Sequence, residues 1–158
     1  MPPAPKIASR RTAQGFTLIE IMIAVVVVAI LATVALPSFM DSIRKSRRSD
    51  AFNAINAVQQ AQERVRANWS QYCGTLGAPP DSSSCGLNLS AGTPNGHYSI
   101  ALSDASATGY VVTATATGSQ AADTRCAKMA ARMLGGALSY GSGPDSVDWS
   151  DPNRCWAK

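Results

Sequence analysis

The stretch that decides the fold is "QGFTLIEIMIAVVVVAILATVALPSF", which runs from Gln14 to Phe39. Within it, Phe16 to Leu36 form an apolar run of 21 residues that is interrupted by a single carboxylate, Glu20. At about 1.5 Å of rise per helical residue, such a run is long enough to cross the roughly 30 Å hydrocarbon layer of a membrane. A basic leader precedes it and a long polar segment follows, which predicts a cytoplasmic leader and an external domain.

Glu20 is the residue that an ordinary membrane anchor does not explain. A charged side chain inside a membrane helix is costly unless a partner neutralises it, and no Lys or Arg occurs between Phe16 and Leu36. A secretory signal peptide also fits poorly, because the apolar run is too long and is interrupted by a charge. Its best small-residue cleavage point, after Ala35, has Thr33 at the third position back.

The net charge of the chain is concentrated at its N-terminus. Lys and Arg number 14 against 10 Asp and Glu, and the sequence pI is about 9.1. Three of the cations, Lys6, Arg10 and Arg11, precede Gly15, so the remainder carries 11 positive side chains against 10 negative ones. The basic pI is therefore weak evidence for binding to nucleic acid.

Four cysteines lie downstream of the apolar run: Cys73, Cys85, Cys126 and Cys155. Zinc binding is disfavoured, because there is no Cys-x-x-Cys motif and His97 is the only histidine. Two disulfides in an oxidising compartment are expected instead, and three pairings are open at this point.

The segment "GFTLIE", Gly15 to Glu20, resembles the processing site of type IV pilins and related pseudopilins. The resemblance implies that a prepilin peptidase cuts after Gly15 and that the new N-terminal amine of Phe16 is methylated. It also implies that Glu20 of one subunit pairs with this amine on a neighbour during assembly, and that Pro37 matches a helix-kinking proline. Cleavage thus creates the positive charge that Glu20 lacks.

An α+β pilin fold follows from the resemblance. A long N-terminal helix, transmembrane in its apolar half, is expected to pack its amphipathic half on an antiparallel meander of three or four strands, with a disulfide-bonded C-terminal loop. The expected segments are a leader at 1–15, a transmembrane and filament-core helix at 16–36, an amphipathic helix at 37–72, a loop at 73–96, and the sheet with the C-terminal disulfide region at 97–158.

Residue patterns downstream of Pro37 predict the individual elements. One helical face carries Phe52, Ile55, Val58, Gln62, Val65 and Trp69, and this helix is expected to end near Trp69 to Tyr72. Residues 97–102 and 110–117 alternate or are β-branched, which favours strands. Residues 126–134 and 137–142, split by two glycines, predict another hairpin, although the composition of the first segment also suits a helix.

The resemblance and the spacing of the cysteines favour one of the three disulfide pairings. Pairing Cys126 with Cys155 would enclose the C-terminal loop, as in the family's disulfide-bonded region. Pairing Cys73 with Cys85 would follow, and would close a short loop rich in Gly, Pro and Ser.

The charged cluster from Arg44 to Asp50 suits either anionic lipid head groups or a solvated helix face that forms inter-subunit ion pairs, and the second is favoured.

Evidence for catalytic or metal chemistry is sparse in the sequence. His97 is expected to be an ordinary sheet or surface histidine. Asp145, Asp148 and Asp151 are spaced by three and present oxygen ligands for calcium, but the spacing does not match an EF-hand loop, so no metal is assigned. Because no phosphate loop, nucleophile elbow or metalloprotease motif occurs, neither an enzyme nor a cofactor is expected.

A DNA-binding surface is a further hypothesis. Its candidate residues are Trp149, Arg154, Trp156, Lys128 and Arg132, which combine aromatic and cationic side chains. The near-neutral charge of the processed chain disfavours a strong site, and Trp156 is expected rather to pack against the disulfide of Cys155.

The main functional prediction is a pilin or minor pilin of a bacterial type IV pilus, which polymerises through its N-terminal helix for motility, adhesion and surface attachment. Its expected partners are copies of itself or other pilins, the prepilin peptidase and the inner-membrane assembly machinery. It would be a single-pass inner-membrane protein with its N-terminus inside, and then part of an extracellular pilus. The alternatives are a pilin-like subunit for DNA uptake or receptor binding, and a type II secretion pseudopilin.

Overall fold

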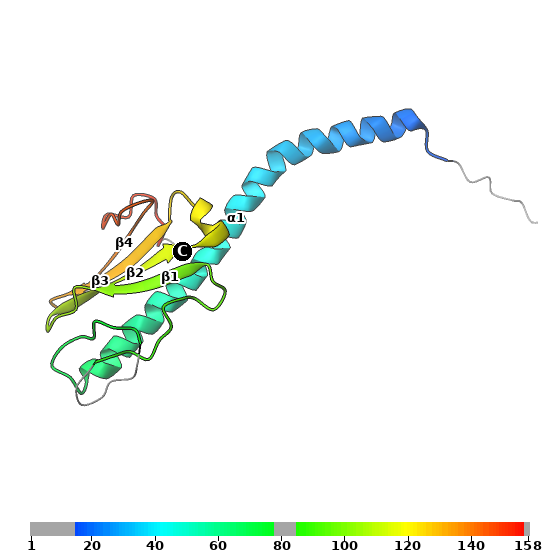
Figure 1. Cartoon of the computed structure of the whole chain (residues 1–158). Helices are drawn as coiled ribbons and strands as arrows, with labels where there is room; N and C mark the ends of the chain where they lie inside the picture. The colour runs from blue at the N-terminus through cyan, green and yellow to red at the C-terminus, as the bar shows by residue number, and fades with distance from the viewer. Residues whose placement is uncertain (1–14, 78–84, 157–158) are drawn as a thin grey trace, which may run out of the picture. The chain divides into compact units, whose positions relative to one another are not determined.

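A computed structural model of the chain describes residues 15–77 and 85–156. Helix α1 (Leu18–Arg66) is followed by strands β1 (Tyr98–Ser103) and β2 (Gly109–Ala116), the short 3-10 helix η1 (Gly118–Ala122), and strands β3 (Lys128–Leu134) and β4 (Ala137–Gly143) (Figure 1). The chain divides into two units, Met1–Phe39 and Met40–Lys158, and the boundary falls inside α1.

The first unit contains the apolar part of α1. Its helix begins after Thr17, whose hydroxyl oxygen accepts a hydrogen bond of 3.3 Å from the backbone N–H of Glu20. This Thr-x-x-Glu spacing is that of a helix N-terminal capping box, and the carboxylate lies at the positive end of the helix dipole. Glu20 therefore has a local role in starting the helix as well as the assembly role expected from the sequence.

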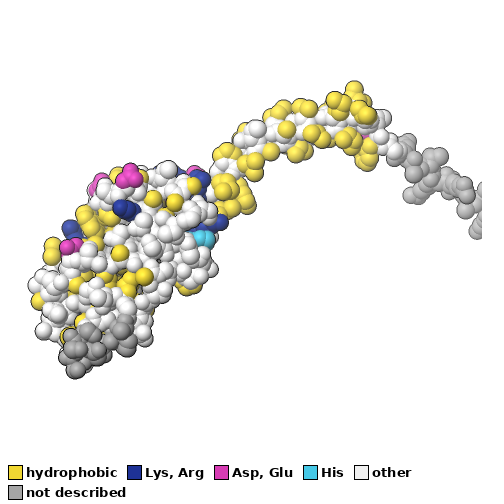
Figure 2. Space-filling view, viewed as in Figure 1, with side chains coloured by type: hydrophobic (Ala, Val, Ile, Leu, Met, Phe, Trp, Pro, Cys, Tyr) yellow, Lys and Arg dark blue, Asp and Glu magenta, His cyan; other side chains and the backbone are white. Residues whose placement is uncertain are grey.

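The large apolar side chains of this unit are exposed. Every large hydrophobic side chain from Phe16 to Phe39 is at least 50 % exposed, and Figure 2 shows them along the helix. α1 is the one described helix that is long and apolar enough to cross a membrane, with a mean hydropathy of 2.9 in its most apolar window. Such a surface requires lipid or other protein chains around it. Pro37 lies inside α1, where it removes one backbone N–H from the helical hydrogen-bond ladder.

The second unit is a four-stranded antiparallel sheet that packs on α1, which confirms the α+β fold expected from the sequence (Figure 1). The strands pair in chain order, with Ile100 opposite Ala114 and Ala131 opposite Tyr140. The turn between β3 and β4 consists of Gly135 and Gly136, whose φ angles of +56° and +85° suit glycine. The segment whose composition also suited a helix is therefore strand β3.

The core of this unit lies between one face of α1 and one face of the sheet. On α1, Ala51, Ile55, Val58 and Ala61 are buried, and alternate residues of the strands face them. The strand residues that belong to this apolar cluster are Tyr98, Ile100, Tyr110, Val112, Ala114, Met129 and Ala131. The helical face predicted from the sequence is the one that packs here, with Phe52 and Val65 half-buried at its margins.

Gln62, the polar residue in this apolar face, is fully buried and holds the chain that follows the helix. Its amide nitrogen donates to the carbonyl oxygen of Cys73 at 2.7 Å, and its amide oxygen accepts from the N–H of Cys73 at 2.9 Å. Cys73 is in turn joined to Cys85 by a disulfide with a Cα–Cα distance of 5.2 Å. Regular helix ends at Arg66, earlier than expected, although the N–H of Trp69 still bonds to Val65.

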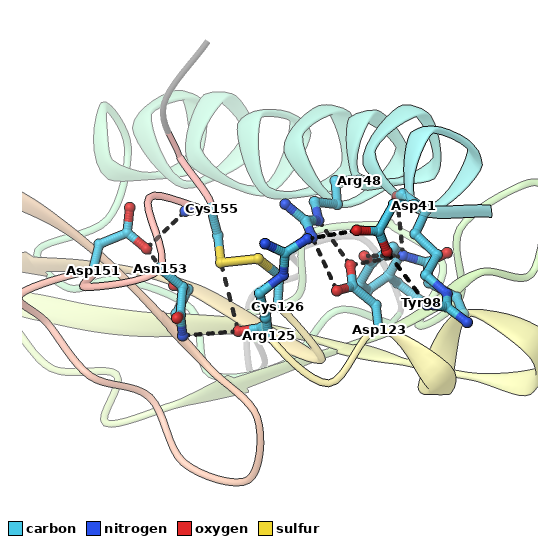
Figure 3. Close-up of polar contacts among 12 residues, drawn as sticks. Asp41, Arg48, Tyr98, Asp123, Arg125, Cys126, Asp151, Asn153 and Cys155 are labelled. Atoms are coloured by element: carbon cyan, nitrogen blue, oxygen red, sulfur yellow. Dashed lines mark hydrogen bonds and ion pairs between the residues drawn. A yellow bond between two sulfur atoms is a disulfide. The ribbon is translucent and has the colours of Figure 1, made fainter. Parts of the chain in front are cut away.

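A buried ion pair joins α1 to the segment after η1. The Nε and Nη2 atoms of Arg48 donate to the two carboxylate oxygens of Asp123 at 2.7 and 2.9 Å (Figure 3). The amide nitrogen of Gln120 donates to the same carboxylate at 3.2 Å and to the hydroxyl oxygen of Tyr98 at 3.1 Å. Burial raises the pKa of Tyr98, so its hydroxyl stays protonated at neutral pH. These bonds fix η1 against the helix, although the buried amide oxygen of Gln120 has no hydrogen-bond partner among the described residues.

Replacing Asp123 with alanine should destabilise the protein by about 3–5 kcal/mol, because the guanidinium of Arg48 would stay buried without its partner. The matched control is Asp41→Ala, which removes the part-exposed pairs of Asp41 with Arg125 and Arg44 and should cost about 0–1 kcal/mol. Urea unfolding of the full chain in mild detergent measures both. Equal losses for the two variants would show that the buried pair does not stabilise the fold in this way.

Candidate functional site

A basic cleft lies between α1 and the C-terminal segment of the second unit. Its volume is about 340 Å³, and three parts of the chain line it: the helix, the segment after η1 and the tail. The lining residues are Lys45, Arg48, Phe52, Arg125, Asn153, Arg154 and Cys155. Four of these seven side chains are cationic, which makes the cleft a candidate site for an anionic ligand.

The disulfide between Cys126 and Cys155 holds two walls of the cleft together, with a Cα–Cα distance of 5.9 Å. Next to it, the amide nitrogen of Asn153 donates to the carbonyl oxygen of Arg125 at 3.2 Å (Figure 3). Arg125 and Arg154, each adjacent to one of these cysteines, are therefore brought to the same cleft although they are far apart in the sequence.

Asp151 shapes the tail that carries Arg154. Its carboxylate accepts hydrogen bonds from the backbone N–H groups of Cys155 at 3.1 Å and Trp156 at 3.2 Å, and also from the hydroxyl of Ser142. Within the resulting turn, Arg154 has a φ angle of +49°. Residues other than glycine, asparagine and aspartate seldom adopt this conformation, so the surrounding bonds impose it.

The cations of the cleft differ in how far they are neutralised. Arg48 is paired with Asp123, and Arg125 donates to Asp41 at 3.0 Å, in a pair that is half-exposed on both sides. Within residues 15–77 and 85–156, neither Lys45 nor Arg154 forms an ion pair, and both are exposed. The cleft thus keeps an excess of positive charge.

An aromatic groove of about 460 Å³ adjoins the cleft through Phe52. Trp156 lines it, with its ring centroid 5.1 Å from that of Phe52 and 4.5 Å from that of Tyr140, and its indole N–H donates to the carbonyl oxygen of Gly141 at 2.8 Å. Trp156 is therefore a packing residue beside the disulfide, as the sequence favoured. Asn53 and Asn56 lie on the helical rim of the groove.

The DNA-binding candidates from the sequence do not form one surface. The guanidinium of Arg132 stacks over the ring of Trp149 at 4.4 Å, in a separate cavity of about 350 Å³ that shares no lining residue with the cleft. Lys128 and Arg132 lie on the face of β3 opposite Met129 and Ala131, because successive residues of a strand alternate. Of these five candidates, Arg154 is the one that lines the cleft, where Lys45 and Arg125 also lie.

Arg125 is not among the binding candidates predicted from the sequence, and Lys45 appears there only within the charged cluster from Arg44 to Asp50. Arg125 precedes Cys126 and Arg154 precedes Cys155 in the sequence, so the disulfide between these cysteines brings the two arginines to one cleft. This adjacency is the feature of the sequence from which the site could have been found. That cluster is otherwise used inside the domain. Arg44 pairs with Asp41 at 3.5 Å, and Arg47 donates to the hydroxyl of Ser119 at 2.7 Å.

The other candidates have ordinary partners. His97 lies 3.9 Å from a carboxylate oxygen of Asp50, which also accepts from the side-chain amide of Asn95. Asp148 accepts hydrogen bonds from the N–H and hydroxyl of Ser150, which lower the pKa of its carboxyl group. Among the described residues there is no group of three side chains arranged to hold a metal ion.

The expected processing and assembly residues lie in the first unit. Gly15 and Phe16 precede α1, Phe16 is 79 % exposed, and Glu20 forms no ion pair with another described residue. Within residues 15–77 and 85–156, the carboxylate of Glu20 therefore has no cationic partner.

Two family models match the chain. Residues 37–130 match the family described as "Type IV minor pilin ComP, DNA uptake sequence receptor"; this range includes β1, β2 and the start of β3, and Lys45 and Arg125 of the cleft but not its tail. Residues 10–36 match the model described as "Prokaryotic N-terminal methylation motif". No curated protein matches the chain.

Proposed function

Because the chain belongs to the type IV minor pilin family whose model matches residues 37–130, we propose that it is a minor pilin that binds DNA through its basic cleft. This family is structural rather than enzymatic. Its description favours the DNA-uptake alternative over motility, adhesion and surface attachment, the main hypothesis from the sequence.

The observation that carries the proposal is that Lys45 and Arg154 lie on two walls of one concave site and form no ion pair within the described ranges 15–77 and 85–156. Phosphate oxygens of DNA are recognised by such groups, and contacts of this kind supply most of the sequence-independent affinity. Arg125, whose side chain is 55 % exposed, presents a guanidinium that can bind a phosphate in a bidentate manner if Asp41 releases it. The chain that remains after cleavage at Gly15 is nearly neutral overall, so it is the local excess of positive charge at the cleft that attracts DNA.

The first unit provides membrane anchoring and then assembly. We propose cleavage between Gly15 and Phe16, methylation of the Phe16 amine, and pairing of this amine with Glu20 of a neighbouring subunit. The apolar helix would hold the subunit in the inner membrane, with the N-terminus inside, before it enters a filament. The prepilin peptidase and other pilins are the partners that this route requires. The methylation-motif match at residues 10–36 supports it.

Replacing Lys45 and Arg154 together with serine should weaken binding of the full processed chain to a duplex of mixed sequence. Each phosphate contact contributes about 0.9 to the slope of log affinity against log salt, so the slope should fall by about two. Fluorescence anisotropy in a series of salt concentrations measures this slope.

The matched control is Arg64→Ser, which removes an exposed arginine from the opposite end of the same helix. It should leave the slope unchanged. If Arg132→Ala lowers the slope and the Lys45 and Arg154 replacements do not, DNA binds the outer face of the sheet and the cleft assignment is wrong.

Replacing Glu20 with alanine should leave the chain processed and membrane-bound but reduce its amount in sheared filaments, because the methylated amine of its neighbour loses its partner. Mass spectrometry of the N-terminal peptide and quantitative blotting of filaments measure these two effects. Incorporation at the wild-type level would contradict the charge-pairing role, and a wild-type chain that still begins at Met1 would contradict the cleavage site.

A further inference from the structure

The basic residues that follow the apolar segment raise a question of membrane placement. Lys45 and its neighbouring arginines lie beyond Leu36, on the side that the proposed orientation places outside, where clusters of Lys and Arg are unusual. The fold accounts for Arg44, Arg47 and Arg48 through bonds inside the domain. It does not account for Lys45, which, like Arg154, remains without an ion-pair partner among the described residues.

We propose that the basic cleft binds the phosphate group of an anionic phospholipid while the subunit is held in the membrane, and that lipid and DNA compete for it. The lipid part rests on the proposed membrane anchoring alone. The competition rests in addition on the proposed DNA binding. The shared chemistry is a phosphodiester recognised by Lys45, Arg125 and Arg154.

The length of the chain between the membrane segment and the cleft allows this contact. Lys45 follows Leu36 by nine residues, and α1 is helical throughout. At about 1.5 Å per residue, their backbones are separated by no more than about 14 Å along the helix, whatever its direction. The head-group layer extends roughly 5–7 Å beyond the hydrocarbon layer, and both a tilt of the helix and the long flexible side chain of Lys45 shorten the remaining separation.

The cleft also has the form that a lipid head group requires. It is concave, with a volume of about 340 Å³, and its cations come from three segments, so they surround a ligand instead of facing it from one side. The half-buried ring of Phe52 adds an apolar wall beside them, suited to the glycerol part of a lipid. The disulfide and the Arg48–Asp123 pair fix the walls in place before any ligand binds.

Competition gives the site an order of events. A subunit in an anionic membrane has its cleft occupied by lipid phosphate, so it does not hold DNA at the membrane surface. Extraction of the apolar helix into a filament removes the cleft from the lipid and leaves the same cations free for DNA. Exposure of the DNA site would thus depend on assembly, with no change of fold.

The test places the full processed chain in lipid nanodiscs of two compositions: phosphatidylcholine alone, and equal parts of phosphatidylcholine and phosphatidylglycerol. Reductive methylation followed by mass spectrometry reports the accessibility of Lys45, and Lys128 on β3 serves as an internal reference. Methylation of Lys45 relative to Lys128 should slow severalfold in the discs that contain phosphatidylglycerol. Millimolar inorganic phosphate added to the phosphatidylcholine discs should not reproduce the effect.

Two variants separate a built site from the general attraction of a charged surface. In Arg125→Ser/Arg154→Ser the protection of Lys45 should largely disappear, whereas in Arg64→Ser it should persist. The inference is overturned if Lys45 reacts equally in both discs, if the double variant keeps full protection, or if free phosphate protects as well as lipid does.

DNA affinity measured in the same discs distinguishes this inference from the proposed function. Duplex binding should be strong in phosphatidylcholine discs and weaker by at least tenfold in those with phosphatidylglycerol, and the difference should shrink in the double variant. Protection of Lys45 without any DNA binding would support the lipid site and reject DNA binding. DNA binding without protection of Lys45 would support the proposed function and reject the lipid site.

Discussion

The buried ion pair between Arg48 and Asp123 is the contact on which the basic cleft depends. It fastens the segment after η1 to the helix, and it removes one cation from the cleft by neutralising it inside the domain. Cys126 follows Asp123 by three residues, and its disulfide to Cys155 holds the C-terminal tail close to the segment that the ion pair fixes. Lys45, Arg125 and Arg154 thereby surround one site, although they lie in three separate parts of the sequence.

The fold was largely predictable because its signals are local. The length of the apolar run, the helical spacing of Ile55, Val58 and Gln62, and the alternation in β1 and β2 each indicate one structure. Strand β3 was less certain, since Ala, Met, Arg and Leu favour helices; its pairing with β2 and the Gly135–Gly136 turn decide the outcome. Gln62 could not be interpreted from its position, because its hydrogen-bond partner is the backbone of Cys73.

The site was less predictable because it is made of long-range contacts. Composition selected Trp149, Trp156 and Arg132 for DNA, but two of these stack on each other and Trp156 packs between Phe52 and Tyr140. The cations available to a ligand could be identified only once the buried ion pairs were known, because the sequence does not show that Arg48 is neutralised by Asp123 whereas Lys45 is not. One cleft that binds phosphate would serve the subunit in two settings, first against lipid and later against DNA.

Photo-crosslinking of the processed chain to duplex DNA, followed by mass spectrometry of the adducts, tests this account most directly. We expect adducts in peptides that contain Lys45, Phe52 or Arg154, and we expect these adducts to be lost when excess phosphatidylglycerol micelles are added. Adducts confined to the outer face of the sheet, at Arg132 and Trp149, would contradict it.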